Sequence, residues 1–424
     1  MSLPVIGFAG MTHLGLNSAV GSAAKGFDVV CFDPSECLAA DLAAGRLPVL
    51  EPQLAELRAE HAGRLRFTAK VGDLARCDVV YVAPDVPTDD RGGSDLGPLI
   101  ALLEQVDAAL GERTVRVILS QVPPGFTRPR VRSGVHLYYQ VETLIFGRAI
   151  ERVLHPERYI VGCDDPAQPL PEAYAAYLGA FGCPVLPMRF ESAELAKISI
   201  NCCLVASISV ANTLGALCER IGADWSEIAP ALKLDRRIGA YSYLAPGLGI
   251  AGGNLERDLA TVCRLADAAG TDAGVVRAWI DNSRHRKDWP LAELHRVVLP
   301  VIARPRIALW GLTYKEDTHS IKNSPALAFL DAVRPFPVRA FDPAIGPQPD
   351  WHPDLTAAAG PVDACRGADV LAILTPWADF RRQSPAAVAE ALAGRVVIDP
   401  YRVLAPAACR AAGLTHLTLG APAA

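Results

Sequence analysis

The N-terminal segment carries the pattern that most limits the fold, a buried strand followed by a helix and a second strand. Residues 5–9 form an apolar run of strand length, residues 14–25 have helical spacing, and residues 28–32 have the pattern of the next strand. This succession predicts a βαβ unit. Further apolar strands at residues 79–83 and 115–119, separated by helical or loop segments, favour a parallel, doubly wound sheet.

Two later segments extend this architecture. Residues 191–221 contain few glycines, no proline and apolar residues at helical spacing, which predicts one long helix. A second α/β pattern starts at residues 306–311 and continues with strands at 338–341, 370–374 and 396–398. The predicted fold class is therefore α/β, with two Rossmann-like, doubly wound parallel-sheet domains joined by a long central helix.

Length and composition limit the class of protein. A chain of 424 residues is too long for one ordinary core, and we expect domains at residues 1–190, 191–295 and 296–424. Hydrophobic residues make up 51% and charged residues 21%, as in a well-packed soluble protein. A net charge of -5 with scattered arginines argues against a nucleic-acid partner. The start lacks a leader pattern and no uninterrupted apolar run approaches about 18 residues, so we expect a cytoplasmic enzyme without a membrane partner.

The turn after the first strand has the form of a dinucleotide-binding loop. Gly10, Thr12 and Gly15 occupy the three positions of a GxGxxG pattern, and Asp33 ends the second strand at the distance expected for a ribose ligand. A carboxylate there would accept hydrogen bonds from the ribose hydroxyls and repel a 2'-phosphate, which favours NAD over NADP. Thr12 departs from the pattern, because its side chain would either crowd the pyrophosphate or donate a hydrogen bond to it. Taken alone, this segment is equally compatible with a purely structural strand-turn-helix.

Short patterns along nearly the whole chain follow a characteristic order. They are Leu50 to Pro52, Ser120 to Gly125, Val141 to Ala149, Glu194 to Asn201, Arg236 to Gly239, Gly247 to Asp258 and Gly311 to Pro325. In that order they resemble the EPxL, STVPPG, PEFLxEGxA, AELxKLxxN, RIG, GFGGSCFPKD and GLAFKxxTxDxRxSP elements of the UDP-glucose/GDP-mannose dehydrogenase family. The resemblance implies a NAD-dependent enzyme that acts on a nucleotide sugar, and a homodimer paired through the long helix.

The same resemblance assigns binding roles. Residues 1–190 would bind NAD, residues 191–295 would form the dimerisation and active-site region, and residues 296–424 would bind the nucleotide sugar. The expected cofactor-binding residues are Gly10, Thr12, His13, Leu14, Gly15, Asp33, Pro84, Ser120 and Lys315. The expected substrate-binding residues are Arg237, Gly252, Gly253 and Lys322; the arginine would reach the neighbouring subunit's substrate. Lys322 stands for an arginine, so it keeps the charge but loses the two-pronged geometry. No metal site is expected.

Three polar residues match the family's machinery for alcohol oxidation. Lys197 and Asn201 are four residues apart, so on a helix both side chains project from one face toward a common point. In the family this lysine and asparagine hold and polarise the reacting oxygen, and Asp258 matches an aspartate that works with the lysine through a bound water. The alternative for such a lysine is a solvated helix surface.

Two other positions depart from the family pattern. Asn254 stands where the family has the cysteine that captures an aldehyde intermediate, and an amide is not the nucleophile that this step needs. Glu142 is kept, but Phe146 replaces a glutamate thought to help the water that hydrolyses the thioester. Cys263, nine residues past Asn254 in a predicted helix, is an unfavourable substitute for the nucleophile. The expected catalytic set is Lys197, Asn201, Asp258, Glu142 and Asn254.

These losses favour an enzyme that oxidises one alcohol of a nucleotide sugar, or of a related sugar derivative, to a carbonyl without forming the acid. In one version NADH is released; in another, retained NAD returns the hydride to the other face, which gives a redox-neutral epimerase. A conventional 6-dehydrogenase giving a uronic acid stays open if Asn254 positions a hydrate. A non-catalytic nucleotide-sugar-binding protein also stays open.

Overall fold

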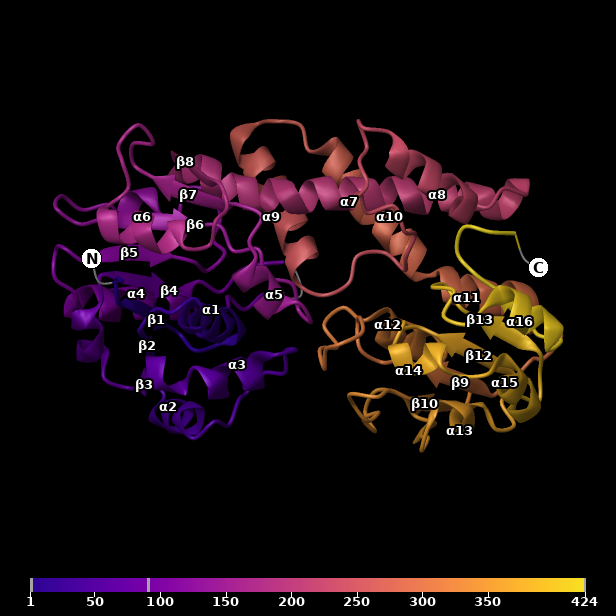
Figure 1. The fold of residues 1–424 in the computed structure, drawn as a ribbon. Coiled ribbons are helices and arrows are strands. Elements are labelled where there is room, and N and C mark those ends of the chain that lie inside the picture. Colours follow the sequence, from indigo (N-terminus) through magenta and orange to yellow (C-terminus); the bar gives the residue numbers. More distant parts are fainter. Residues whose placement is uncertain (1–2, 90–91, 423–424) are drawn as a thin grey trace. The chain divides into compact units, whose positions relative to one another are not determined.

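The computed structural model describes residues 3–89 and 92–422, and the chain divides into two compact units, Met1–Ile200 and Asn201–Ala424 (Figure 1). Each unit contains one β-sheet with helices packed on it. Helix α7 (Phe190–Ile221) starts in the first unit and continues into the second, which agrees with the predicted helix at residues 191–221.

The first unit contains an eight-stranded sheet in the order β3-β2-β1-β4-β5-β6-β7-β8. Its strands are β1 (Ile6–Ala9), β2 (Val29–Phe32), β3 (Leu65–Thr68), β4 (Val79–Val82), β5 (Val115–Ile118), β6 (Leu137–Gln140), β7 (Tyr159–Cys163) and β8 (Val185–Arg189). Its helices before α7 are α1 (His13–Ala24), α2 (Glu36–Ala43), α3 (Leu54–Glu60), α4 (Gly97–Ala109), α5 (Ala149–Leu154) and α6 (Glu172–Gly179). All strand pairs are parallel except β6 with β7, a difference from the predicted parallel sheet.

Core packing explains why the central strands are continuous apolar runs. In β4, Val79 and Tyr81 pack in one hydrophobic cluster with α1, α5 and α6, whereas Val80 and Val82 pack in a second cluster with α4 and the start of α7. Successive side chains of a strand point to opposite faces, so a strand covered on both faces is apolar at nearly every position. The exception in β5 is Arg116, whose Nε donates a hydrogen bond to Asp107 Oδ1 (2.9 Å). The four residues of β1, β2, β4 and β5 are accordingly all buried.

The second unit contains a six-stranded, fully parallel sheet in the order β11-β10-β9-β12-β13-β14. Its strands are β9 (Ile307–Trp310), β10 (Val338–Phe341), β11 (Leu355–Ala357), β12 (Val370–Ile373), β13 (Val396–Ile398) and β14 (Thr415–Leu417). Its helices after α7 are α8 (Trp225–Leu234), α9 (Asn254–Ala269), α10 (Gly274–Lys287), α11 (Trp289–Glu293), α12 (Pro325–Ala332), α13 (Pro361–Cys365), α14 (Ala378–Arg381), α15 (Pro385–Ala391) and α16 (Pro406–Ala411).

Both sheets repeat the strand order of a doubly wound nucleotide-binding fold. Counting strands in chain order, the first six strands of each sheet lie in the order 3-2-1-4-5-6. The order reverses between β1 and β4 in the first unit and between β9 and β12 in the second. Ligands of such sheets bind outside the carboxyl ends of the strands at this reversal. The predicted fold class is confirmed.

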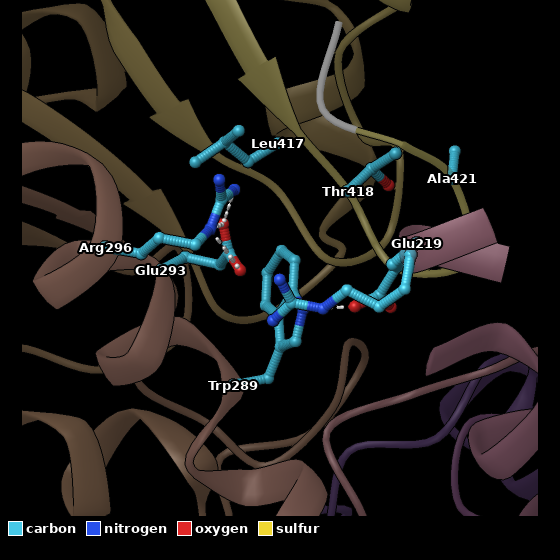
Figure 2. A pocket seen from close by; sticks show the side chains of 8 residues that line it. Glu219, Trp289, Glu293, Arg296, Leu417, Thr418 and Ala421 are labelled. Carbon is cyan, nitrogen blue, oxygen red and sulfur yellow. Dashed lines mark hydrogen bonds and ion pairs between the residues drawn. The ribbon is translucent and has the colours of Figure 1, made fainter. Parts of the chain in front are cut away.

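The C-terminal part of α7 is fixed within the second unit by a largely buried polar cluster, of which Figure 2 shows Glu219 and Trp289. One carboxylate oxygen of Glu219 accepts hydrogen bonds from Arg286 Nη2 (2.9 Å) and from the N–H of Gly420 (3.0 Å), and the other accepts from Trp289 Nε1 (3.1 Å). Beside this cluster lies a cavity of about 50 Å³, which the ion pair between Arg296 and Glu293 also lines. Glu219 therefore connects α7 with α10, α11 and the segment after β14.

By length and composition α7 would suffice to cross a membrane, because its charges stand near its ends. The sequence prediction considered only uninterrupted apolar runs. Polar residues interrupt the apolar stretch of α7, so this helix was not predicted as a membrane span. The core helix of a soluble protein can have the same length and composition. Within the second unit, polar side chains of α7 bind neighbouring elements; Asn212 Oδ1, for example, accepts a hydrogen bond from the N–H of Gly247 (2.8 Å).

Candidate active site

The turn between β1 and α1 has the backbone geometry of a dinucleotide-binding loop. Gly10 has φ +92°, and a Cβ there would lie 2.8 Å from the nitrogen of Pro84. A Cβ on Gly15 would lie 1.9 Å from the carbonyl oxygen of Gly10. Both positions therefore require glycine, the first for the tight turn and the second for close approach of helix and strand.

The carboxylate of Asp33 is held at the end of β2. One oxygen accepts a hydrogen bond from the N–H of Met11 (2.9 Å) and the other from the N–H of Ser35 (3.0 Å). A carboxylate has about four lone-pair positions, so two backbone hydrogen bonds leave acceptor capacity for ribose hydroxyls. The adenosine end of NAD fits this arrangement.

The N-terminus of α1 carries a carboxylate that the sequence analysis missed. Asp85 Oδ2 accepts a hydrogen bond from the N–H of His13 (2.9 Å), and the N–H of Asp85 donates to Thr12 Oγ1 (2.8 Å). The signal was available, because Asp85 follows the apolar run of β4, the strand beside β1. A pyrophosphate would need the same helical N–H group, so this end of the turn does not fit the cofactor as it stands.

The His13 side chain lies against two other segments. Its Nε2 is 2.7 Å from Glu51 Oε1, and its ring stacks on Phe146 with centroids 4.1 Å apart. Burial pushes the pKa of Glu51 upward, but hydrogen bonds from His13 and from the N–H groups of Gly147 and Ala149 outweigh it, so the pKa lies below its usual value. Phe146 thus packs on the cofactor turn. Leu14 packs in the hydrophobic core, which leaves only its backbone for the cofactor.

Two further predicted cofactor residues lie together at the carboxyl ends of β4 and β5. Ser120 Oγ donates a hydrogen bond to the carbonyl oxygen of Pro84 (2.5 Å), and Pro84 in turn packs on Gly10. The first unit therefore brings together Gly10, Thr12, His13, Pro84 and Ser120 around the crevice where the strand order reverses.

In the first unit, Lys197 of α7 pairs with Glu142. Lys197 Nζ is 2.7 Å from Glu142 Oε1, and both side chains are largely buried. One turn earlier, Glu194 accepts hydrogen bonds from the N–H groups of Gly125 (2.6 Å) and Thr127 (2.8 Å), which fixes the start of α7 on the segment after β5. Burial raises the pKa of Glu194. Lys197 is therefore a held, largely buried amine and not a solvated surface lysine.

In the second unit, Asn201 of α7 pairs with Asp258 of α9. Asn201 Nδ2 donates to Asp258 Oδ2 (2.5 Å), and Arg257 Nε lies 3.3 Å from Asp258 Oδ1. Asp258 is 2% exposed. Asn254 is the first residue of α9 and its side chain is exposed. The four-residue spacing from Lys197 to Asn201 holds on the continuous helix α7.

The loop before α9 is bound to the segment around residue 322. Gly252 has φ +77°, its N–H donates to the carbonyl oxygen of Lys322 (3.0 Å), and its carbonyl accepts from Asn323 Nδ2 (2.9 Å). A Cβ on Gly252 would lie 3.0 Å from the Tyr314 ring. Gly253 has an ordinary φ of -103°, so its glycine is not required by the backbone. Sequence reasoning missed the roles of Asn323 and Tyr314.

Two predicted binding residues lie apart from these groups. Arg237 follows α8; its side chain is 89% exposed and pairs with Asp235 (2.6 Å). Lys315 belongs to the second unit, where its Nζ lies 5.9 Å from the centroid of the Tyr314 ring, whereas the cofactor turn belongs to the first. Neither unit by itself brings Lys315 to the other predicted cofactor residues.

The neighbouring thiols are poor substitutes for a nucleophile at residue 254. Cys263 is 8% exposed and packs in an apolar cluster with Val205 and Leu259. Burial raises the pKa of Cys202 to about 11, so that thiol is not ionised at neutral pH. Within residues 3–89 and 92–422, no group of three or more His, Cys, Asp or Glu residues is placed to hold a metal ion.

Comparison with known proteins covers almost the whole chain. Residues 4–177 match the NAD binding domain, residues 191–284 the central domain and residues 308–406 the UDP binding domain of the UDP-glucose/GDP-mannose dehydrogenase family. The UDP-glucose 6-dehydrogenase of Pseudomonas aeruginosa is 29% identical, with 100% of this chain and 98% of the relative covered. AglM, a UDP-glucose 6-dehydrogenase of Haloferax volcanii, is 30% identical, with 95% and 97% covered. The NAD binding domain and these relatives identify NAD as the cofactor.

Solved structures agree with this assignment. A UDP-glucose dehydrogenase from Pyrobaculum islandicum superimposes with a TM-score of 0.83 at 25% identity, with 95% of each chain covered. The UDP-D-ManNAc dehydrogenase of Pyrococcus horikoshii gives a TM-score of 0.82 at 22% identity over 98% of this chain and 99% of that one, which shows the shared fold. The chain belongs to the UDP-glucose/GDP-mannose dehydrogenase family.

Proposed function

We propose that this protein is a NAD-dependent oxidoreductase that oxidises one alcohol of a nucleotide sugar to a carbonyl and stops there. The observation that carries the proposal is the residue at the start of α9. Asn254 is exposed at this position, where the family pattern has a cysteine. The amide nitrogen is not nucleophilic, so no covalent adduct can hold an aldehyde for a second hydride transfer.

The residues that match the family's groups for the first hydride transfer support this proposal. Lys197 would hold and polarise the reacting oxygen, and Asn201 would donate a hydrogen bond to it. Asp258 would accept the hydroxyl proton through a water molecule, acting as a general base. The chemistry that bound NAD would supply here is a hydride acceptor. One C–H and one O–H bond break, one C=O bond forms, and one proton is released.

The substrate is expected to be a UDP-sugar. The match of residues 308–406 to a UDP binding domain supports this, as do the relatives named UDP-glucose 6-dehydrogenase. We propose that residues 1–190 bind the cofactor, 191–295 form the dimer and carry Asp258, and 296–424 bind the nucleotide. Lys322 would meet the phosphates, and the loop at Gly252 and Gly253 would border the sugar.

With purified protein and UDP-glucose, we expect one NADH for each sugar consumed, and a product that hydroxylamine traps as an oxime. Absorbance at about 340 nm counts the hydride, and mass spectrometry identifies the product. Asp258→Asn is the matched control, because it keeps the shape but removes the base and should lose both signals.

The other outcomes select the alternatives. Two NADH for each uronic acid would contradict the proposal and indicate a conventional 6-dehydrogenase. A product of unchanged mass and altered stereochemistry, without net NADH, would indicate an epimerase with retained NAD. Tight binding of UDP-sugars without any product would indicate a non-catalytic binding protein.

We also propose that the protein is a homodimer paired through α7. Four apolar side chains lie along one stripe of its C-terminal half at intervals of three and four residues, Val210, Leu214, Leu217 and Ile221. They are 49%, 41%, 50% and 64% exposed, which is unusual for a contiguous apolar stripe on a monomer. The exposed Arg237 would then be able to reach the partner's substrate.

The double variant Leu214→Glu/Leu217→Glu should be monomeric, because two carboxylates would be desolvated on each side of the pairing surface. Light scattering after size exclusion measures the mass. Leu265→Glu is the control, since Leu265 is 37% exposed on α9 and outside the stripe. An unchanged dimer mass in the double variant would rule out pairing through this face.

A further inference from the structure

The cofactor turn of the first unit contains an acid where the cofactor's pyrophosphate is expected. Helix α1 has no acidic residue in its first turn, and Thr12, its N-cap residue, makes no capping hydrogen bond with its own helix. Asp85 supplies the missing acceptor from a segment 72 residues away, through the hydrogen bond from the N–H of His13 (2.9 Å). The helix is therefore capped by a carboxylate from the end of β4.

Thr12 and Asp85 form a matched pair. The N–H of Asp85 donates to Thr12 Oγ1 (2.8 Å), so the threonine at the middle glycine position orients the backbone that carries the carboxylate. A glycine at residue 12 would offer no such acceptor. The two departures from an ordinary dinucleotide turn are thus one hydrogen-bonded arrangement.

With Asp85 bound to the N-terminus of α1, a pyrophosphate cannot bind favourably at the same N-terminus. A helix N-terminus binds pyrophosphate through its unpaired N–H groups and its positive end of the helix dipole. The Asp85 carboxylate uses the N–H of His13 and brings a negative charge within hydrogen-bond distance of it. A pyrophosphate there would meet like charge and lose a donor. The expected ribose acceptor, Asp33, directly follows β2 and binds other backbone N–H groups, those of Met11 and Ser35.

We propose that Asp85 competes with the pyrophosphate of NAD for the N-terminus of α1, and that Thr12 holds it in the competing position. The carboxylate must swing away before the dinucleotide binds, so the free protein is held in a state of low affinity for NAD. Asp85 thereby sets the cofactor affinity of this chain without touching the nicotinamide or the sugar.

The test measures binding of NADH, ADP-ribose and adenosine by calorimetry, without any sugar. Asp85→Asn keeps the side-chain shape and removes the charge. It should bind NADH and ADP-ribose about tenfold more tightly than the unaltered protein, which corresponds to about 1.4 kcal/mol. Adenosine, which has no pyrophosphate, should bind both proteins equally. Asp95→Asn is the matched control, because Asp95 caps a nearby backbone N–H, that of Gly97, and should leave all three affinities unchanged.

A second variant, Thr12→Gly, keeps the proposal testable if Asp85→Asn does not fold. Thr12→Gly removes the acceptor of the Asp85 N–H and should tighten ADP-ribose binding in the same direction, by about threefold. Equal or weaker binding of ADP-ribose by Asp85→Asn, or by Thr12→Gly if Asp85→Asn does not fold, would overturn the proposal. Because no turnover is measured, this result is independent of the reaction proposed above.

Discussion

Replacing Lys197 with methionine should lower kcat for sugar oxidation about a thousandfold, within the range that positioned acid-base groups supply. Methionine keeps most of the apolar stem and removes the amine that would polarise the reacting oxygen. In the structure this amine is largely buried and 2.7 Å from Glu142, so its position is fixed before any substrate arrives. Initial rates of NADH formation at saturating UDP-sugar measure the effect.

The same substitution leaves the Glu142 carboxylate without its cation, which would also destabilise the fold. The double variant Lys197→Met/Glu142→Gln separates the two effects, because it should recover the unfolding temperature but not the rate. Lys233→Met, at an exposed position of α8, should leave both unchanged. A kcat for Lys197→Met within tenfold of the unaltered enzyme would remove Lys197 from the mechanism.

The extent to which the fold could be predicted follows from how each strand is buried. β1 and β4 are covered on both faces, and their sequences are uninterrupted apolar runs that are visible without a structure. β5 is buried as well but contains one charged residue, Arg116. β3 and β8 contain no buried residue and include charged ones, so their strand character depends on pairing with a neighbour. The antiparallel pairing of β6 with β7 depends on the connection between them and leaves no local mark.

Some features of the candidate site could be predicted from the sequence and others could not. The turn glycines could be predicted because their requirement is local: Gly10 needs its positive φ, and Gly15 needs to approach Gly10. The position of Asp85 after the apolar run of β4 was visible in the sequence, but its hydrogen bond with Thr12, 73 residues away, was not. The hydrogen bond between Asn323 and Gly252, 71 residues apart, likewise leaves no local pattern. Only the sheet order and the loop packing bring such residues together, and a single sequence does not state either.

Glu219→Ala should lower the free energy of unfolding of the second unit by about 3–5 kcal/mol, because it removes one partner of a buried ion pair. Arg286 is 2% exposed and would keep its charge without the carboxylate, while Trp289 Nε1 and the N–H of Gly420 would lose their acceptor. A loss of this size lowers the melting temperature by roughly 10 °C in a domain of about 200 residues.

Two further variants show whether the unpaired charge is the cause. Glu219→Ala/Arg286→Met removes both charged partners and should recover much of the loss, since an apolar pair in the same place has no charge to desolvate. Glu227→Ala, on the exposed face of α8, should change the stability by less than about 0.5 kcal/mol. Calorimetric unfolding measures all three. If Glu219→Ala had the same melting temperature as the unaltered protein, Glu219 would not be the connection that holds α7 to the C-terminal segment.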